Sequence, residues 1–173
     1  MNLYFRLIGF IIKAIFNKKH KDILDEIITP MRVLPNDLDI NMHMNNGRYL
    51  TVMDFGRFDY IIYTGMLGLC IKNKWTPILG SAYIQYKKPL ILWQKYNIIT
   101  KIECWDDKWF VMSQLFEYNG TIMAIAYVRG LFRGKNGNIK PSQLFKTLHP
   151  DAEMPQSPVP AKEIQTWLTQ HTT

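Results

Sequence analysis

The sequence predicts an α+β domain in which one long helix packs on an antiparallel sheet. A helical pattern of apolar residues begins at Arg48, and four segments rich in β-branched and aromatic residues follow from Ser81 onward. Short polar turns separate these segments, and one of them, Asn119-Gly120, is a strong signal for a two-residue hairpin. A single helix followed by such a run of strands is typical of a helix layer on a sheet.

The length and composition indicate one domain. The chain has 173 residues, of which 47% are hydrophobic, enough for a substantial core. A formal net charge of +7 favours anionic partners in general. The basic residues are scattered and match no nucleic-acid motif, so nucleic acid is not expected as a partner. Cys70 and Cys104 lack the spacing of a disulfide scaffold or a metal site, and no metal is predicted.

Residues 1–22 are predicted to form an N-terminal apolar and basic helix. The apolar run from Leu3 to Phe16 is shorter than the roughly 20 residues that span a bilayer, and no small-residue cleavage site follows it. Two interpretations stay open. Residues 1–20 either contact an anionic membrane surface through the cluster Lys18-Lys19-His20-Lys21, or pack on the domain or an oligomer interface. The protein is expected in the cytoplasm, either free or peripheral to a membrane.

The long helix is expected to begin after Asn45 or Asn46, since either residue is a suitable N-cap. Gly65 and Gly68 mark its end. Gly56, in its middle, lowers helix propensity but allows a close approach to the sheet.

Extended segments flank this helix. Pro30 and Pro35 bracket a short extended stretch, Met31 to Leu34. The four segments after the helix, joined by tight turns, predict an antiparallel meander. These predicted strands are Ser81–Leu92, Tyr96–Trp105, Trp109–Tyr118 and Thr121–Arg133.

The chain divides into a main domain over residues 23–149 and a proline-rich C-terminal tail over residues 150–173. Four prolines punctuate the first part of this tail, which is expected to be extended. Ala161 to Gln170 is predicted to form a short helix, with Trp167 docked on the rest of the protein.

Candidate chemistry concentrates between Asp37 and Asn46. Two carboxylates, Asp37 and Asp39, precede the helix start, and His43 follows four residues later. A helix N-terminus offers unpaired N–H donors that stabilise a developing oxyanion. A carboxylate beside it can attack a carbonyl or activate water. The same residue types also form Asx turns and caps in inert loops, so both interpretations stand on this segment alone.

The segment resembles a known family signature. Val33-Leu-Pro-Asn-Asp37-Leu-Asp39-Ile-Asn-Met-His43-Met-Asn45-Asn46-Gly-Arg-Tyr49 is similar to Asp-x-Asp-x-x-Gly-His-x-Asn-Asn-x-x-Tyr of the 4-hydroxybenzoyl-CoA thioesterase-like hotdog family. Within that family, the thioesterase superfamily member six subgroup shares further features: Val-Leu-Pro-x-Asp-Leu-Asp, His-Met-Asn-Asn, Asp54-Phe55 with Arg57, and Trp105-Asp106-Asp107. The resemblance covers roughly residues 30 to 135. It implies a hotdog fold, an antiparallel sheet wrapped around a long central helix.

The resemblance also implies an activity, the hydrolysis of an acyl-CoA or other acyl thioester to a free acid and a thiol. Asp39 matches the catalytic carboxylate, as nucleophile or general base, and Asp54 is the alternative for relatives that carry the acid on the helix. His43 and Asn45 match positions that shape the pocket. Backbone N–H groups at the helix start would polarise the thioester carbonyl. The implied substrate-binding residues are Asn46, Gly47, Arg48, Tyr49, Lys87 and Lys88, with Arg133 as a further phosphate partner.

The family pattern carries further expectations. Coenzyme A enters only as part of the substrate, and no separate cofactor is expected. Hotdog sites form between two subunits, which implies a homodimer or a larger homo-oligomer. Met42 replaces the glycine that usually precedes the histidine, and its bulk is expected to narrow the site or alter the backbone approach. A protein that binds acyl-CoA or lipid without hydrolysis is therefore the alternative function.

Overall fold

The computed structural model describes residues 8, 9, 12 and 21–170. The predicted N-terminal helix of residues 1–22 therefore lies almost wholly outside the described residues. Among these residues, no helix combines the length and hydrophobicity needed to cross a bilayer.

The long helix, α2, spans Asn46–Tyr63 and is the one expected from the apolar spacing. Asn45 is its N-cap, because the Asn45 side chain accepts a hydrogen bond from the Gly47 N–H. Gly65, at φ +78°, separates α2 from a short helix, α3, at Met66–Asn73. Gly65 therefore marks the end of α2 as predicted, whereas Gly68 lies inside α3, which was not predicted.

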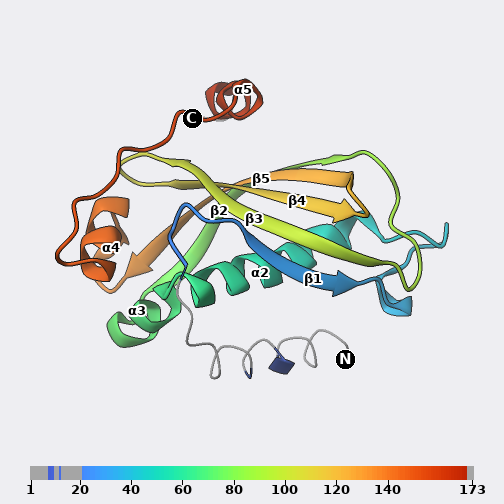
Figure 1. The fold of residues 1–173 in the computed structure, drawn as a ribbon, viewed down its shortest axis with the longest axis horizontal. Coiled ribbons are helices and arrows are strands. Elements are labelled where there is room, and N and C mark those ends of the chain that lie inside the picture. The colour runs from blue at the N-terminus through green and yellow to red at the C-terminus, as the bar shows by residue number, and fades with distance from the viewer. Residues whose placement is uncertain (1–7, 10–11, 13–20, 171–173) are drawn as a thin grey trace.

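The described part of the chain forms one six-stranded antiparallel sheet, in the order β1-β3-β4-β5-β2, with β6 paired to β5. It curls over α2, which lies against one face (Figure 1). The strands are β1 at Ile27–Arg32, β2 at Thr76–Tyr86, β3 at Lys95–Trp105, β4 at Phe110–Tyr118, β5 at Thr121–Gly134 and β6 at Gly137–Ile139.

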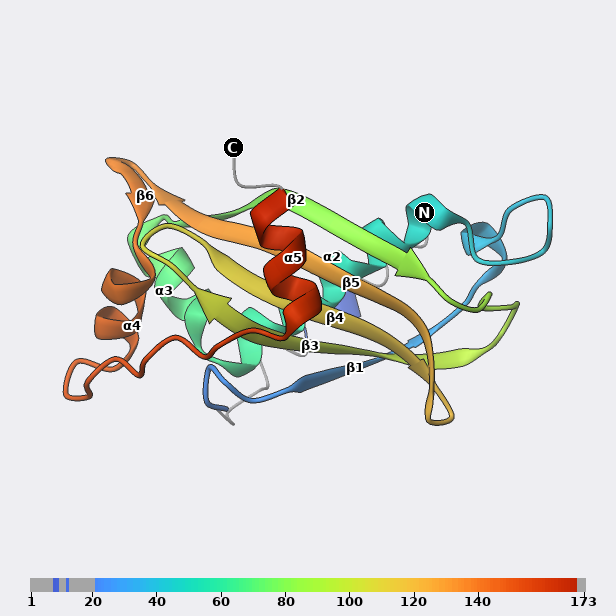
Figure 2. The ribbon, with the colours of Figure 1, turned by 90° about the horizontal axis from the view of Figure 1, so that it is seen from above.

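The predicted order of the strands was partly wrong. Strands β3, β4 and β5 form the expected meander, and Asn119 and Gly120 both take positive φ in the hairpin between β4 and β5. Strand β2 does not continue this meander, because it pairs with β5 at the far edge and leaves its other edge without a strand partner in the described sheet. Viewed from above, β1 and β2 lie at opposite edges (Figure 2).

Gly56 lets α2 approach the sheet closely, as predicted. A Cβ atom on Gly56 would lie 2.7 Å from Nε2 of Gln114, 2.8 Å from Oγ1 of Thr100 and 2.9 Å from Cγ2 of Ile98. Any side chain at this position would therefore push the helix away from β3 and β4.

Two further helices follow the sheet. Helix α4, at Pro141–Leu148, begins with a proline in its first turn and was not predicted. Helix α5, at Lys162–Gln170, matches the predicted tail helix and lies on the opposite face of the sheet from α2 (Figure 2). Trp167 is buried there against a small cluster that includes Cys104 and Val111, so the tail is docked.

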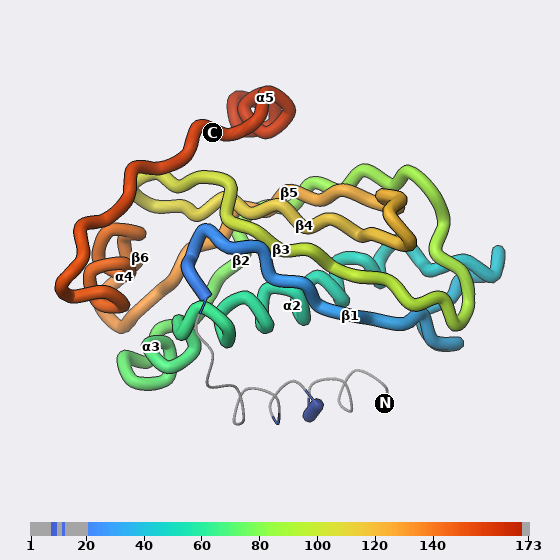
Figure 3. Tube along the Cα trace, viewed as in Figure 1, coloured from blue at the N-terminus to red at the C-terminus, as the bar shows by residue number. Residues whose placement is uncertain are grey.

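The core under α2 has two halves. One, near the start of the helix, is built around Tyr49, Met53 and Phe116. The other, near its end, is built around Tyr60, Met66 and Phe132. The loop before α2 and helices α3 and α4 lie at opposite ends of the molecule (Figure 3).

Candidate active site

Asp37 is a structural residue of the loop before α2. Its side chain is fully buried, and its carboxylate accepts hydrogen bonds from the Leu34 N–H at 2.9 Å and from Nη2 of Arg48 at 2.8 Å. The Arg48 guanidinium, predicted to bind substrate, is thus paired with Asp37. This ion pair fastens the loop to the first turn of α2.

Asp39, the predicted catalytic acid, is half-buried and shapes the turn that follows it. Its Oδ1 accepts hydrogen bonds from the N–H groups of Asn41 at 2.8 Å and His43 at 3.3 Å. Its Oδ2 has no hydrogen-bond partner among the described residues. The carboxylate is therefore oriented by the loop through one oxygen, while the other is available to a ligand.

The predicted oxyanion donors at the helix start are mostly occupied. The Gly47 N–H donates to the Asn45 side chain at 2.8 Å, and the Arg48 N–H donates to the Asn45 carbonyl at 2.8 Å. The Asn46 N–H has no acceptor in the part of the chain that the structure describes. One N–H group, and not three, thus remains to polarise a carbonyl.

Tyr49 anchors this corner from inside. It is buried, its ring contacts that of Tyr86 at a centroid distance of 5.0 Å, and Tyr86 Oη donates to the Asn46 carbonyl at 3.0 Å. Burial raises the pKa of Tyr49 to about 12, against the lowering effect of its hydrogen bond with the Leu90 backbone. Tyr49 is therefore neutral and belongs to the packing that positions the helix start.

The backbone conformation at Met42 explains why the family pattern has a glycine at this position. The φ of Met42 is +62°, in the left-handed region that residues other than glycine rarely adopt, and the residue is 60% exposed. The glycine is thus expected for its backbone conformation. The neighbouring His43 is half-buried and forms a backbone bridge to Ile91.

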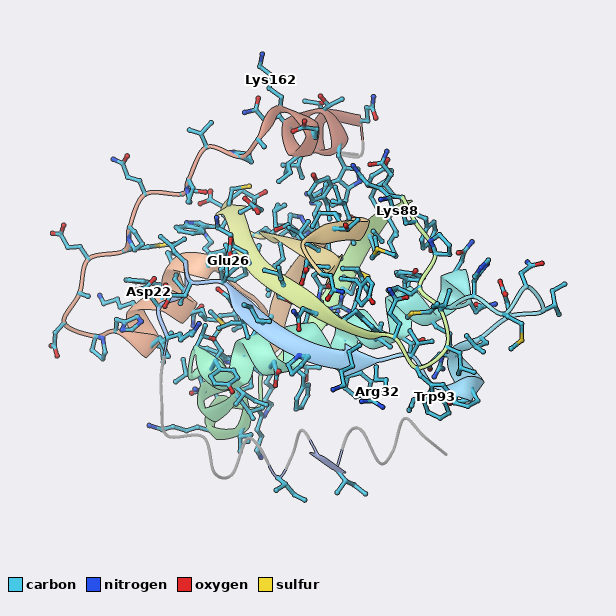
Figure 4. The ribbon with its side chains drawn as sticks, turned by 45° about the vertical axis from the view of Figure 1, so that its right-hand side comes forward. Asp22, Glu26, Arg32, Lys88, Trp93 and Lys162 are labelled. Carbon is cyan, nitrogen blue, oxygen red and sulfur yellow. The ribbon has the colours of Figure 1, made fainter. Side chains whose placement is uncertain are left out.

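The proposed phosphate partners lie apart. Lys87 and Lys88 are exposed just beyond the end of β2 beside the start of α2, with Lys88 standing at the surface in Figure 4. Arg133 pairs with Thr76 at the opposite end of β2, about 30 Å away along the strand, and donates to Asn138. Arg133 cannot share a ligand phosphate with these lysines in one protomer.

A second set of hydrogen-bonded polar side chains lies about two turns further along α2, and the sequence did not predict that these residues contact one another. The Arg57 guanidinium donates to the Asp54 carboxylate and, at 2.7 Å, to Oε1 of Gln114. Nε2 of the buried Gln114 donates in turn to the Met53 carbonyl and to Thr100. Burial lowers the pKa of Arg57, and the nearby Asp54 charge opposes that effect.

Asp54 stands at the edge of an apolar cavity of about 270 Å³. The cavity lies between the second half of α2 and strands β2 to β5, and its wall includes Pro77 and Leu79 of the exposed β2 edge. The Asp54 side chain is 71% exposed, so its carboxylate is open to solvent beside the cavity. None of the residues of the Asp39 loop lines this space.

The described residues contain no group of three or more His, Cys, Asp or Glu side chains that could bind a metal ion. The two cysteines are buried apart from each other, and burial raises the pKa of each thiol to about 11.

Comparison with known proteins decides the family. The Thioesterase-like superfamily matches residues 33–168, most of the chain. The chain belongs to this superfamily. A protein named THEM6 from Xenopus laevis is 37% identical over 106 residues, covering 61% of this chain and 51% of the relative. Protein THEM6 from Danio rerio is 34% identical over 131 residues, covering 74% of this chain and 65% of the relative. This chain therefore spans about half to two thirds of the length of these relatives.

Solved structures share the fold. YbaW, a probable thioesterase from Escherichia coli, aligns with a TM-score of 0.65 at 19% identity, covering 70% of this chain and 95% of YbaW. DHNA-CoA thioesterase from Staphylococcus aureus aligns with a TM-score of 0.62 at 17% identity, covering 86% and 95%. The predicted hotdog fold and the resemblance to the member six subgroup are both confirmed.

Proposed function

We propose that this member of the Thioesterase-like superfamily hydrolyses an acyl thioester of coenzyme A to a free acid and a thiol, at a site completed by a second copy of the chain. The observation that carries this proposal is the arrangement of β2. The outer edge of β2 has no strand partner among the described residues. One end of β2 borders the cavity and Asp54, and its other end contacts the start of α2 through Tyr86 and Asn46.

We infer that two copies of the chain pair through their β2 strands about a two-fold axis, which would complete such a site. Edge strands with apolar side chains are seldom left exposed, and Leu79, Tyr83 and Tyr86 are exposed on β2. In an antiparallel pair, the Tyr86 end of one strand meets the Thr76 end of its partner. The Asp39 loop and the Asn46 N–H of one protomer then approach the cavity and Asp54 of the other.

In this site the acyl group occupies the cavity, and the thioester carbonyl lies at its mouth. The Asn46 N–H polarises that carbonyl. Asp39, the family position for the acid, attacks the carbonyl or activates water with its unpartnered oxygen. Asp54 is the second acid at the same mouth. The exposed Lys87 and Lys88 lie near the helix start, where they can meet coenzyme A phosphates.

The test is thiol release from a panel of acyl-CoA substrates by the Asp39→Asn and Asp54→Asn variants, alone and mixed under conditions that exchange subunits. Loss of the catalytic acid should lower turnover by about 10²- to 10⁴-fold. If both acids are needed and come from different protomers, random mixing restores up to about a quarter of wild-type activity, because half the dimers are mixed and each holds one intact site.

The outcomes separate the roles. If one variant alone is inactive, that residue is the acid. If the mixture of two inactive variants stays inactive, both acids belong to one protomer and the shared site is wrong. If neither variant lowers turnover, the proposed chemistry is wrong.

A protein that binds an acyl-CoA or lipid without cleaving it is the second candidate. It is favoured by the use of Asp39 Oδ1 in the loop turn and by Met42 at a glycine position. Binding of acyl-CoA by the wild-type protein without any thiol release would select it.

A further inference from the structure

The cavity beside Asp54 limits the length and polarity of the acyl group that was proposed above to occupy it. We propose that the substrate class is an unsubstituted hydrocarbon acyl chain of about ten carbons, with Gly130 setting the length. The inference rests on the proposed function only for the place of the acyl group, and its ligand preference can be measured without turnover.

The volume of the cavity indicates how many acyl carbons it can hold. A dry apolar cavity of about 150 Å³ accommodates benzene, with six carbons. On the same scale, the observed 270 Å³ takes about ten carbons. Ile61, Met66, Ile102 and Phe132 line the cavity, and all four are buried.

The apolar character of the wall disfavours hydroxylated aryl groups. Its only ionisable side chains are Asp54, Arg57 and Tyr60, and each has a partner. Arg57 donates to Asp54 and Gln114, and the Tyr60 hydroxyl donates to the Ile23 carbonyl. Away from the Asp54 carboxylate, a ring hydroxyl buried in this space would lose water without gaining a side-chain partner, which disfavours such ligands.

The absence of a side chain at Gly130 leaves room in the cavity. Gly130 lines the cavity on β5, and side-chain alternation places it on the same face as Val128 and Phe132, which also line the cavity. A Cβ atom on Gly130 would have a single neighbour within 4 Å, the Ile78 carbonyl oxygen at 3.4 Å, an ordinary contact. A side chain here is therefore tolerated by the backbone and takes up space that the ligand would use.

The experiment measures, by calorimetry, the affinity of this chain for non-hydrolysable thioether analogues of acyl-CoA with 4 to 16 carbons and for a dihydroxybenzoyl analogue. Each added methylene should tighten binding about fourfold, up to about ten carbons, with no gain beyond. Gly130→Ala should shorten this limit by about one carbon and Gly130→Val by about three, which weakens decanoyl binding by at least about tenfold. Gly68→Val, at an exposed glycine of α3 with no neighbour within 4 Å of its Cβ position, should leave the limit unchanged.

Two results would overturn the inference: tighter binding of the dihydroxybenzoyl analogue than of the decanoyl analogue, or an unchanged length limit in both Gly130 variants. Thiol release from the matching thioesters is scored separately. The expected length profile without thiol release supports the ligand class and rejects hydrolysis. Thiol release only from the dihydroxybenzoyl thioester rejects the ligand class and supports hydrolysis.

Discussion

The two ends of α2 are built in different ways. The loop before its first turn is held by hydrogen bonds over short sequence distances: Asp37 to Arg48, Asp39 to the two N–H groups after it, and Asn45 to Gly47. The second half of the helix instead covers an apolar cavity walled by residues from α2, α3 and four strands. A polar loop whose hydrogen-bonding groups pair with near neighbours can be predicted from the sequence. A cavity that arises from the packing of distant segments cannot be predicted in this way.

The largest effect on stability is expected at the loop end. Asp37→Asn removes the charge that pairs with Arg48, whose side chain is only 21% exposed, and weakens the contact with the Leu34 N–H. Breaking a buried ion pair from one side should lower the free energy of unfolding by about 3 kcal/mol. Urea denaturation measures this loss. Asp107→Asn, in an exposed turn, is the matched control and should change stability by less than about 0.5 kcal/mol.

Between the two ends, Gly56 tests how tightly the helix is pressed on the sheet. Gly56→Ala places a methyl group within 3 Å of three side chains and should destabilise the protein by about 1–3 kcal/mol, although alanine favours helices. Gly68→Ala, in open space on α3, should have the opposite sign and stabilise by up to about 1 kcal/mol. Equal thermal shifts for both variants would contradict the close approach at Gly56.

The two ends of α2 should lose stability over different pH ranges. Burial raises the pKa of Cys70, in the cavity half, to about 11, so the folded state keeps a proton that the unfolded state releases near pH 9. This contribution to stability is complete below about pH 8.5 and is lost as the pH rises to 11. Tyr49, at the loop end, has its pKa raised to about 12, so its contribution is lost only between about pH 10 and 12.

Denaturation from pH 8 to 11.5 measures both contributions. Cys70→Ala should flatten the fall in stability between about pH 9 and 11, and Tyr49→Phe should flatten only the part above about pH 10. Identical profiles for the two variants would mean that burial of these groups does not govern the alkaline dependence.

The smallest effect is expected at Met42. Because its φ is +62°, Met42→Gly should relieve backbone strain and stabilise the loop by up to about 1 kcal/mol. Ile40→Gly, at an exposed neighbour outside the positive-φ region, should instead destabilise slightly. Thermal denaturation of the pair gives the sign, and destabilisation by both glycines would reject the strain at Met42.

Particular residues show how far the sequence predicted the site. The Asn45 cap, the Asn119-Gly120 turn and the close approach at Gly56 were all predicted and are all present. Arg133 was predicted as a phosphate partner together with Lys87 and Lys88, but within one protomer the sheet places it at the opposite end of β2 from them. The contacts of Arg57 with Gln114, 57 residues away, could not be predicted because no local pattern links the two.

The order of residues alone predicted the long helix and its N-cap, the strands β3 to β5, the turn chemistry of the Asp39 loop and the superfamily. These features depend on backbone preferences and hydrogen bonds between near neighbours, which the order of residues encodes directly. Three features emerge only when the chain is folded: β2 lies at the far edge beside β5, Asp37 forms an ion pair with Arg48, and a cavity opens beside Asp54. Those features arise from contacts between distant segments, whose pairing is set by the packing of the whole core.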